Sequence, residues 1–306
     1  MADPAAPTLV MGVAPRRSLY SALRSTVPNF WTLTKPEVNF LIVIATFTGF
    51  YLGWPGSLRP FPFVRLLDTL LGTLLVASGT GALNQYIEHR FDAQMRRTCK
   101  RPVPAGRLRP AAAAWFGVAL AAIGAVYLLV TVNALASLLA VLTLTSYLFV
   151  YTPLKRKTPL CTLAGAFPGA MPPLIGWAAA SGSIAGGEAW ILYAVLFLWQ
   201  FPHFMAIVWM YREDYARAEY AMLPVKNQST FLTWQTLPPA LLLFVFSLAA
   251  ASGFPWCAAT AVLGCGLLYY AARHVRLQSK IAARQLLKAT IIYLPLQFLI
   301  LVLARP

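Results

Sequence analysis

Long stretches without charge alternate with short polar segments along the whole chain. Seven runs of at least 16 residues lack Asp, Glu, Lys and Arg, and two of them, 110–154 and 227–272, are long enough for two bilayer crossings of about 20 residues each. Polar breaks at 131–133 and 252–255 divide these two runs. The pattern therefore predicts nine spans, at 38–54, 65–87, 111–131, 133–151, 160–180, 189–210, 231–251, 256–272 and 287–304.

Helices are the expected form of these spans. Backbone groups in hydrocarbon must find hydrogen bonds within the segment, and the alternation typical of barrel strands is absent from the sequence. The predicted fold class is an all-α integral membrane protein with nine transmembrane helices, formed by residues 29–306 as a single polytopic domain. Residues 1–28 are rich in Pro and Ala and lack the apolar segment of a cleaved signal peptide, so we expect a flexible cytoplasmic tail.

The composition supports this class, and the membrane topology explains the large excess of basic residues. The chain is 59% hydrophobic and only 11% charged, whereas a soluble domain is about 25% charged. With the N-terminus inside, 22 of the 25 Lys and Arg residues fall on the inner side, as the positive-inside rule requires. The net charge of +16 thus needs no nucleic-acid partner. The tail is not strongly Arg- or Ser-rich, which favours a bacterial inner membrane with a cytoplasmic N-terminus over a mitochondrial one.

Acidic residues are scarce and clustered. Five of the nine Asp and Glu residues lie in two short stretches, 88–92 and 213–219. Both stretches stand at the inner end of a span that runs from outside to inside, the second and the sixth. The two clusters therefore share one face of the membrane.

The first cluster has the spacing of a helical ligand face. Asn84, Glu88 and Asp92 are four residues apart, so they lie on one side of a helix and advance about 6 Å per step. Mg²⁺ prefers such oxygen ligands and usually takes one or two carboxylates together with substrate phosphates. A solvated helix end paired with Arg90 or Arg96 is the alternative interpretation.

Other polar residues near the inner face are candidates for anion and substrate binding. In the second cluster, Asp214 is placed to bind a second metal, with Tyr211 beside it. Basic residues next to a metal-binding acidic face suit a diphosphate, although basic inner loops are also expected from topology alone. His203, inside the sixth span, is either a hydrogen-bonded structural residue or a substrate contact. The basic candidates are Arg97, Arg101, Lys155 and Arg156.

The motif Asn84-xxx-Glu88-xxx-Asp92, followed by Met95-x-Arg97-Thr98-xx-Arg101-Pro102, resembles the UbiA superfamily of intramembrane prenyltransferases. Further segments narrow the resemblance to the haem-farnesylating branch of that superfamily, and together they extend it from about residue 30 to 300. These segments are Leu33-Thr34-Lys35-Pro36, Tyr151-Thr152-Pro153-Leu154-Lys155-Arg156, Pro172-Pro173-Leu174-Ile175-Gly176-Trp177, Trp199-Gln200-x-Pro202-His203-Phe204 and Tyr211-Arg212-Glu213-Asp214-Tyr215 with Met222-Leu223-Pro224.

This resemblance implies a bundle of nine helices around a central cavity and a reaction that moves farnesyl from farnesyl diphosphate to a vinyl group of haem B. The products would be haem O, for haem–copper terminal oxidases, and diphosphate. Mg²⁺ would be the cofactor, and haem B a substrate. Expected partners are farnesyl diphosphate, haem B, membrane lipid and haem A synthase or oxidase assembly factors. The implied metal ligands are Asn84, Glu88, Asp92 and Asp214, and the implied diphosphate and substrate contacts are Lys35, Arg97, Arg101, Lys155, Arg156, His203 and Tyr211.

Two residues depart from the usual family pattern, and three other functions compete with haem farnesylation. Cys161 stands where relatives usually have Asn, and Glu219 where they usually have Gly, so Glu219 either joins the metal site or points to water. A different UbiA-type enzyme would prenylate an aromatic acid or a quinone precursor. A transporter of an anionic substrate would scatter polar residues near the membrane midplane, whereas here they gather at the inner face. A non-catalytic assembly subunit would leave the acidic clusters without a role.

Overall fold

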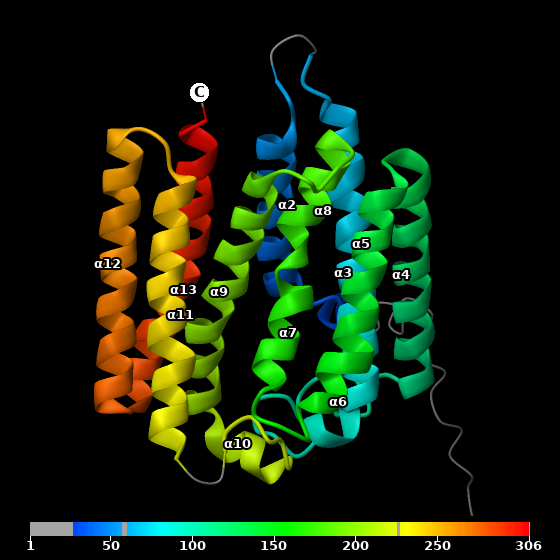
Figure 1. Ribbon diagram of the computed structural model, residues 1–306. Coiled ribbons are helices and arrows are strands. Elements are labelled where there is room, and N and C mark those ends of the chain that lie inside the picture. Colours follow the sequence, from blue (N-terminus) through cyan, green and yellow to red (C-terminus); the bar gives the residue numbers. More distant parts are fainter. Residues whose placement is uncertain (1–26, 57–59, 225–226, 306) are drawn as a thin grey trace, which may run out of the picture.

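The computed structural model describes residues 27–56, 60–224 and 227–305, and every regular element within those ranges is helical. The predicted tail, residues 1–28, lies almost entirely outside the described residues. A helix whose described part covers 27–33 leads into the bundle shown in Figure 1. The helices run roughly side by side, and their connections gather at two opposite ends.

The elements follow the order in which the hydrophobic runs occur. They are α2 (Pro36–Gly53), α3 (Phe63–Asp92), α4 (Pro110–Thr131), α5 (Ala134–Ser146), the π-helical turn η1 (Tyr147–Tyr151), α6 (Thr152–Leu154), α7 (Cys161–Gly169), α8 (Met171–Ser181), α9 (Gly187–Met210), α10 (Arg212–Arg217), α11 (Gln228–Ala250), α12 (Phe254–Leu277) and α13 (Lys280–Leu303).

The predicted spans each have a helical counterpart in the described part of the chain. Eight helical segments there are long and apolar enough to cross a membrane, counting α5, η1 and α6 as one. The ninth crossing, predicted as one helix over 160–180, is divided at Ala170 into α7 and α8. Pro168 inside α7 and Pro172 and Pro173 at the start of α8 lack the amide hydrogens that a continuous helix needs, which accounts for the break.

Three spans continue several residues beyond the charge-free runs that predicted them, and one of these, α12, extends through Arg273 and Arg276 to Leu277. α3 continues to Asp92, so both carboxylates of the first acidic cluster lie on its last turns. α13 begins at Lys280, where the Ser279 hydroxyl accepts a hydrogen bond from the backbone N–H of Ala282 at 3.1 Å. Charged side chains at these ends reach the polar boundary of the membrane, so they do not terminate the helix.

Glycines allow the closest helix contact in the bundle, between α2 and α8. A Cβ on Gly176 would collide with the backbone carbonyl of Thr46, and a Cβ on Gly49 would collide with that of Pro173. Helices in lipid gain little hydrophobic free energy from associating, so close backbone approach through small residues is their main source of packing energy.

We predict that Gly176→Ala destabilises the bundle by about 1–3 kcal/mol, because backbone atoms of α2 must move to admit the methyl group. The measurement is thermal unfolding of the purified protein in detergent. Gly266→Ala is the matched control, since nothing lies within 4 Å of the added Cβ and Ala is the better helix former. Equal melting temperatures for the two variants would contradict the close packing of α2 on α8.

Candidate functional site

A ladder of three buried oxygen-bearing side chains occupies the end of α3. Asn84, Glu88 and Asp92 are all buried on one side of this helix. The amide of Asn84 donates a hydrogen bond to Glu88 Oε2 at 2.9 Å. Because α3 is regular through 84–92, the four-residue spacing places the three groups one above the other along the helix.

Each member of this ladder is matched by a cation from a different segment. Lys35 Nζ donates to Asn84 Oδ1 at 2.8 Å, and Lys155 Nζ donates to Glu88 Oε1, also at 2.8 Å. Arg101 donates to Asp92 Oδ2 at 2.6 Å. Buried carboxylates require such partners, since an isolated charge in the protein interior is strongly unfavourable.

Local backbone contacts hold the three cationic segments in place. Lys35 adopts a left-handed conformation, φ 53°, just before α2. The Thr98 hydroxyl donates to the carbonyl of Asp92 at 2.9 Å, which fixes the loop that carries Arg101. The backbone N–H of Ala221 donates to the carbonyl of Lys155 at 2.8 Å, which ties the 155–160 loop to the segment after α10.

The pKa values of Lys35 and Lys155 shift in opposite directions in this environment. Burial lowers the pKa of Lys35 to about 7, aided by the positive charges of Arg101 and Lys155 and opposed by Glu88 and Asp92. Burial would also lower the pKa of Lys155, but the adjacent Glu88 carboxylate outweighs it and raises that pKa above its ordinary value. Lys155 therefore stays charged.

The second acidic stretch joins the first through Arg97. The backbone N–H of Arg97 donates to Asp214 Oδ2 at 3.3 Å, while Asp214 also pairs with Arg217 on α10. The Arg97 guanidinium lies 5.0 Å from the centroid of the Tyr211 ring and donates to the Tyr215 hydroxyl at 3.2 Å. The loop after α3 and helix α10 thus form one surface.

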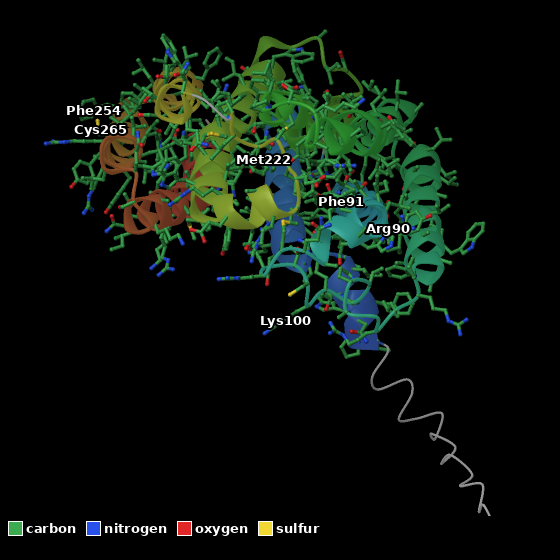
Figure 2. All side chains as sticks on the ribbon, turned by 90° about the horizontal axis from the view of Figure 1, so that it is seen from below. Arg90, Phe91, Lys100, Met222, Phe254 and Cys265 are labelled. Carbon is green, nitrogen blue, oxygen red and sulfur yellow. The ribbon has the colours of Figure 1, made fainter. Side chains whose placement is uncertain are left out.

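A cavity of about 350 Å³ opens beside this surface. At its rim, Lys280 of α13 pairs with Glu213 at 3.3 Å. Figure 2 views this end of the bundle, with Phe91 and Met222 toward its middle and Lys100 at its edge. The lining residues are Arg96, Arg97, Met210, Tyr211, Glu213, Asp214 and Lys280.

Two of the sequence candidates lie apart from the ladder. The Arg156 side chain is 46% exposed, with its guanidinium 4.3 Å from the centroid of the Phe91 ring. His203 lies about two turns before the C-terminal end of α9. Its Nδ1 is 2.9 Å from the Thr290 hydroxyl, and its ring stacks on the Trp199 ring with the two centroids 4.4 Å apart. The structure brings Lys35, Arg101 and Lys155 to the ladder, and Arg97 and Tyr211 to Asp214.

Both departures from the family pattern have a structural explanation. Glu219 has φ 55°, in the left-handed region where glycine is favoured, and its 79% exposed side chain points to water 3.7 Å from Arg156. It does not face Asp214. Cys161 is buried, and its Sγ lies 3.4 Å from the sulfur of Met222, so a thiol fits there as a packing group.

Several residues around the site were missed by the sequence analysis. Tyr147 and Tyr151 surround Lys155, with Nζ 6.0 Å and 4.6 Å from their ring centroids. Their spacing of four residues just before Lys155, at the inner end of a span, was an available signal. Thr98 belongs to the motif that resembles the family, but its contact with the Asp92 carbonyl depends on how the loop folds and does not follow from spacing.

A model of the UbiA prenyltransferase family matches residues 42–294 of the chain. The chain belongs to the UbiA prenyltransferase family. It is therefore an intramembrane prenyltransferase.

Similar proteins agree with this membership. A protohaem IX farnesyltransferase from Solibacter usitatus is 44% identical over 285 residues, 90% of this chain and 97% of that protein. One from Koribacter versatilis is 40% identical over 310 residues, 95% of this chain and 96% of that protein.

Solved structures of UbiA-type proteins share the fold. A digeranylgeranylglyceryl phosphate synthase matches with a TM-score of 0.71 at 16% identity, over 92% of this chain and 98% of that one. A UbiA homologue from Archaeoglobus fulgidus, bound to GPP and Mg²⁺, matches with a TM-score of 0.58 at 14% identity, over 89% of this chain and 99% of that one.

The donor set of this UbiA family member is chemically suited to Mg²⁺. The ladder and Asp214 offer only oxygen ligands, which this hard cation prefers. Among the described residues, no group of three His, Cys, Asp or Glu side chains is close enough to hold a metal ion. A bound Mg²⁺ would thus need further oxygens, such as those of a diphosphate.

We predict that Glu219→Gly raises the free energy of unfolding by about 1 kcal/mol without lowering turnover, because it removes left-handed strain at a residue whose side chain is exposed to solvent. Glu219→Ala is the matched control: it also deletes the contact with Arg156 but keeps the strained Cβ. Denaturant or thermal unfolding in detergent measures both. A loss of activity in the Gly variant would show that Glu219 serves the site.

We predict that Arg101→Gln lowers stability by about 1–3 kcal/mol, because Asp92 is then buried without its charged partner. Arg156→Gln, which breaks a pair between two solvent-exposed side chains, is expected to have almost no effect. Thermal unfolding of both variants in the same detergent compares them. Equal losses would mean that the Arg101–Asp92 pair is not buried.

Proposed function

We propose that this chain transfers the farnesyl group of farnesyl diphosphate to a vinyl group of haem B, giving haem O and diphosphate. Two relatives named protohaem IX farnesyltransferase, which align over 90% and 95% of the chain, support this choice of substrates. The observation that carries the proposal is the buried ladder Asn84–Glu88–Asp92 with its three matched cations. A diphosphate is an anion that such a mixed set of carboxylates and cations can bind.

In this proposal the ladder and Asp214 hold Mg²⁺ together with the phosphate oxygens. The bound metal would neutralise charge that develops on the departing diphosphate. A UbiA homologue of the same fold, bound to GPP and Mg²⁺, supports the pairing of metal and prenyl diphosphate in this architecture.

The basic residues orient the diphosphate and stabilise it as a leaving group. Lys35, Arg101 and Lys155 reach the ladder and the backbone N–H of Arg97 reaches Asp214, which supports our proposal that all four donate to phosphate oxygens. When the allylic C–O bond breaks, its electron pair leaves with the diphosphate, and fixed donors lower the cost of that charge. Arg156, at the exposed edge, is assigned a role in attracting the anion.

The acceptor half of the reaction needs an enclosed, apolar space. The terminal carbon of the haem vinyl group attacks C1 of the farnesyl cation. Water then adds to the resulting porphyrin-stabilised cation and loses one proton to solvent, which leaves a hydroxyethylfarnesyl group. No protein nucleophile takes part. His203 and Tyr211 are proposed substrate contacts, and they are separated by about 12 Å along the axis of α9, enough to reach different parts of a large substrate.

The proposed setting is a bacterial inner membrane, with the N-terminus and the ladder on the cytoplasmic side. The bacterial relatives and the 22-to-3 distribution of basic residues support this orientation. Haem O would pass to haem A synthase or to oxidase assembly factors.

The deciding experiment uses purified protein in lipid nanodiscs with Mg²⁺, labelled farnesyl diphosphate and haem B. Chromatography and mass spectrometry then detect haem O. We expect haem O from the native chain and a loss of about 100-fold or more for Asp92→Asn, which removes the carboxylate charge but keeps the side-chain shape. Glu188→Gln, at an exposed acidic residue of the opposite end of the bundle, is the matched control.

The outcomes separate the alternatives. Label on 4-hydroxybenzoate and none on haem would replace haem B with an aromatic-acid acceptor. Full activity of a folded Asp92→Asn variant would remove Asp92 from the metal site. Failure to transfer the label to either acceptor, with uptake of label into sealed vesicles, would favour a transporter.

A further inference from the structure

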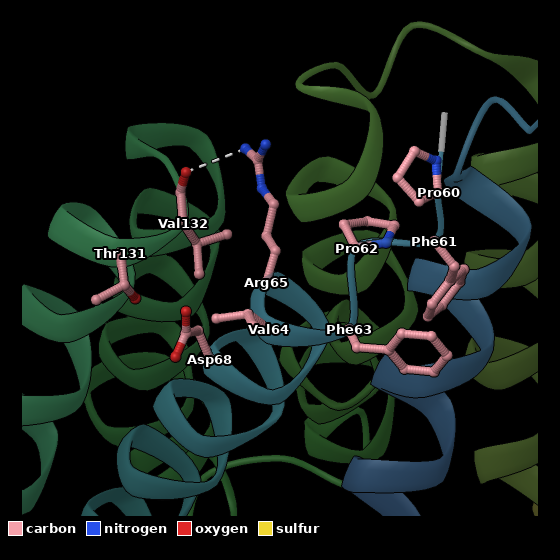
Figure 3. Close-up of a pocket in the computed structure, with 9 residues that line it drawn as sticks. All are labelled: Pro60, Phe61, Pro62, Phe63, Val64, Arg65, Asp68, Thr131 and Val132. Atoms are coloured by element: carbon pink, nitrogen blue, oxygen red, sulfur yellow. Dashed lines mark hydrogen bonds between the residues drawn. The ribbon is translucent and has the colours of Figure 1, made fainter. Parts of the chain in front are cut away.

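A second cavity, of about 670 Å³, lies at the opposite end of the bundle from the ladder. It is formed by the first turns of α3, the segment before them and the last residues of α4 (Figure 3). Asp68 and Asp92 are 24 residues apart on α3, or about 36 Å along the helix, so this cavity is separate from the proposed active site. Its size is in the range of small-molecule sites.

Arg65 is the cation of this cavity, and its hydrogen bonds are incomplete. One terminal nitrogen, Nη2, donates to the carbonyl of Val132 at 3.0 Å. Its Nε is buried and has no hydrogen-bond partner. Buried donors without partners are rare in proteins, so this guanidinium has hydrogen-bonding capacity that the described residues do not use.

Asp68 is the anion of the same cavity, three residues further along α3. Its Oδ1 accepts a hydrogen bond from the Tyr127 hydroxyl at 2.6 Å. Side chains at this spacing are neighbours on a helix, and opposite charges there usually pair. Arg65 and Asp68 form no ion pair with each other, nor with any other side chain in the described ranges. The cavity therefore presents a separated positive and negative group.

The surroundings place this charge pair at a membrane surface. Phe63, Val64 and Leu67, on the same turns of α3, are exposed apolar side chains. They lie at the end of a predicted membrane span, where the acyl chains of a lipid meet its headgroup. The polar cavity matches the headgroup of a phospholipid, and the apolar side chains beside it match the acyl chains.

We propose that this cavity binds the headgroup of phosphatidylethanolamine from the leaflet opposite the ladder. The phosphate accepts hydrogen bonds from Arg65, and the primary ammonium donates to Asp68. The acyl chains lie along Phe63, Val64 and Leu67. A choline headgroup has no N–H to donate to Asp68, and phosphatidylglycerol would leave the Asp68 carboxylate without a cation, so the ethanolamine headgroup is preferred over both.

The test reconstitutes the full chain in nanodiscs with equal amounts of phosphatidylethanolamine, phosphatidylcholine and phosphatidylglycerol, and identifies retained lipid by native mass spectrometry. The native chain is expected to retain the ethanolamine lipid at least tenfold over each of the others. Arg65→Gln, which removes the guanidinium, should retain at least tenfold less. Asp68→Asn, which can still accept from Tyr127, should lose the preference among headgroups. Glu188→Gln, an exposed acidic residue at the same end, is the matched control and should behave as the native chain.

Retention of the three lipids in equal amounts, or an unchanged preference in Asp68→Asn, would overturn the proposal. A preference for phosphatidylglycerol would assign the cavity to anionic lipids instead. If Arg65→Gln does not fold, as judged by thermal unfolding, Arg65→Lys tests the same point, and it should keep binding but weaken it because an ammonium lacks the planar fork. The readout is lipid retention, so it does not depend on farnesyl transfer.

Discussion

The arrangement of the end of the bundle that carries the ladder depends on one constraint, which is that buried carboxylates must be neutralised. Glu88 and Asp92 project from α3 into the protein, and each needs a cation within hydrogen-bond distance. The cations come from the loop directly after α3 and from the loop after α6, while Lys35, ahead of α2, binds Asn84. Helices that are far apart in the chain are thus held at one end by charge, while small residues hold them together within the membrane. The two forms of stabilisation act on different parts of the bundle.

Much of this fold could be predicted from the sequence, because a segment that crosses lipid must be hydrophobic, so each long hydrophobic run marks a membrane span. The span positions were correct to within a few residues except where the rule used charge as a boundary: α3, α12 and α13 continue past it, since Lys, Arg, Glu and Asp at a helix end reach water or partners. Three prolines mark the break at Ala170. The break was not predicted, because the run is otherwise apolar and its hydrophobicity alone indicates one continuous helix.

The site was predictable to the extent that it follows helix geometry. Spacing placed Asn84, Glu88 and Asp92 on one face, and their common burial agrees with it. The pairing of Lys155 with Glu88, 67 residues apart, could not be read from spacing, because it depends on how distant spans pack. Glu219 illustrates the opposite case: its left-handed backbone explains why glycine suits the position, and only the structure shows that the side chain turns to water.

The cations that pair with the ladder also bear on substrate binding and product release. In the absence of substrate, Lys35, Lys155 and Arg101 satisfy the very oxygens that are proposed to bind metal. Under the proposed function, binding of Mg²⁺ with diphosphate would be an exchange of partners, in which internal pairs break as new ones form, and the affinity would be lower than the contacts alone would give. The same exchange would run in reverse after the reaction. As the internal pairs re-form, they would help to release the product diphosphate from a site built to hold a highly charged ion.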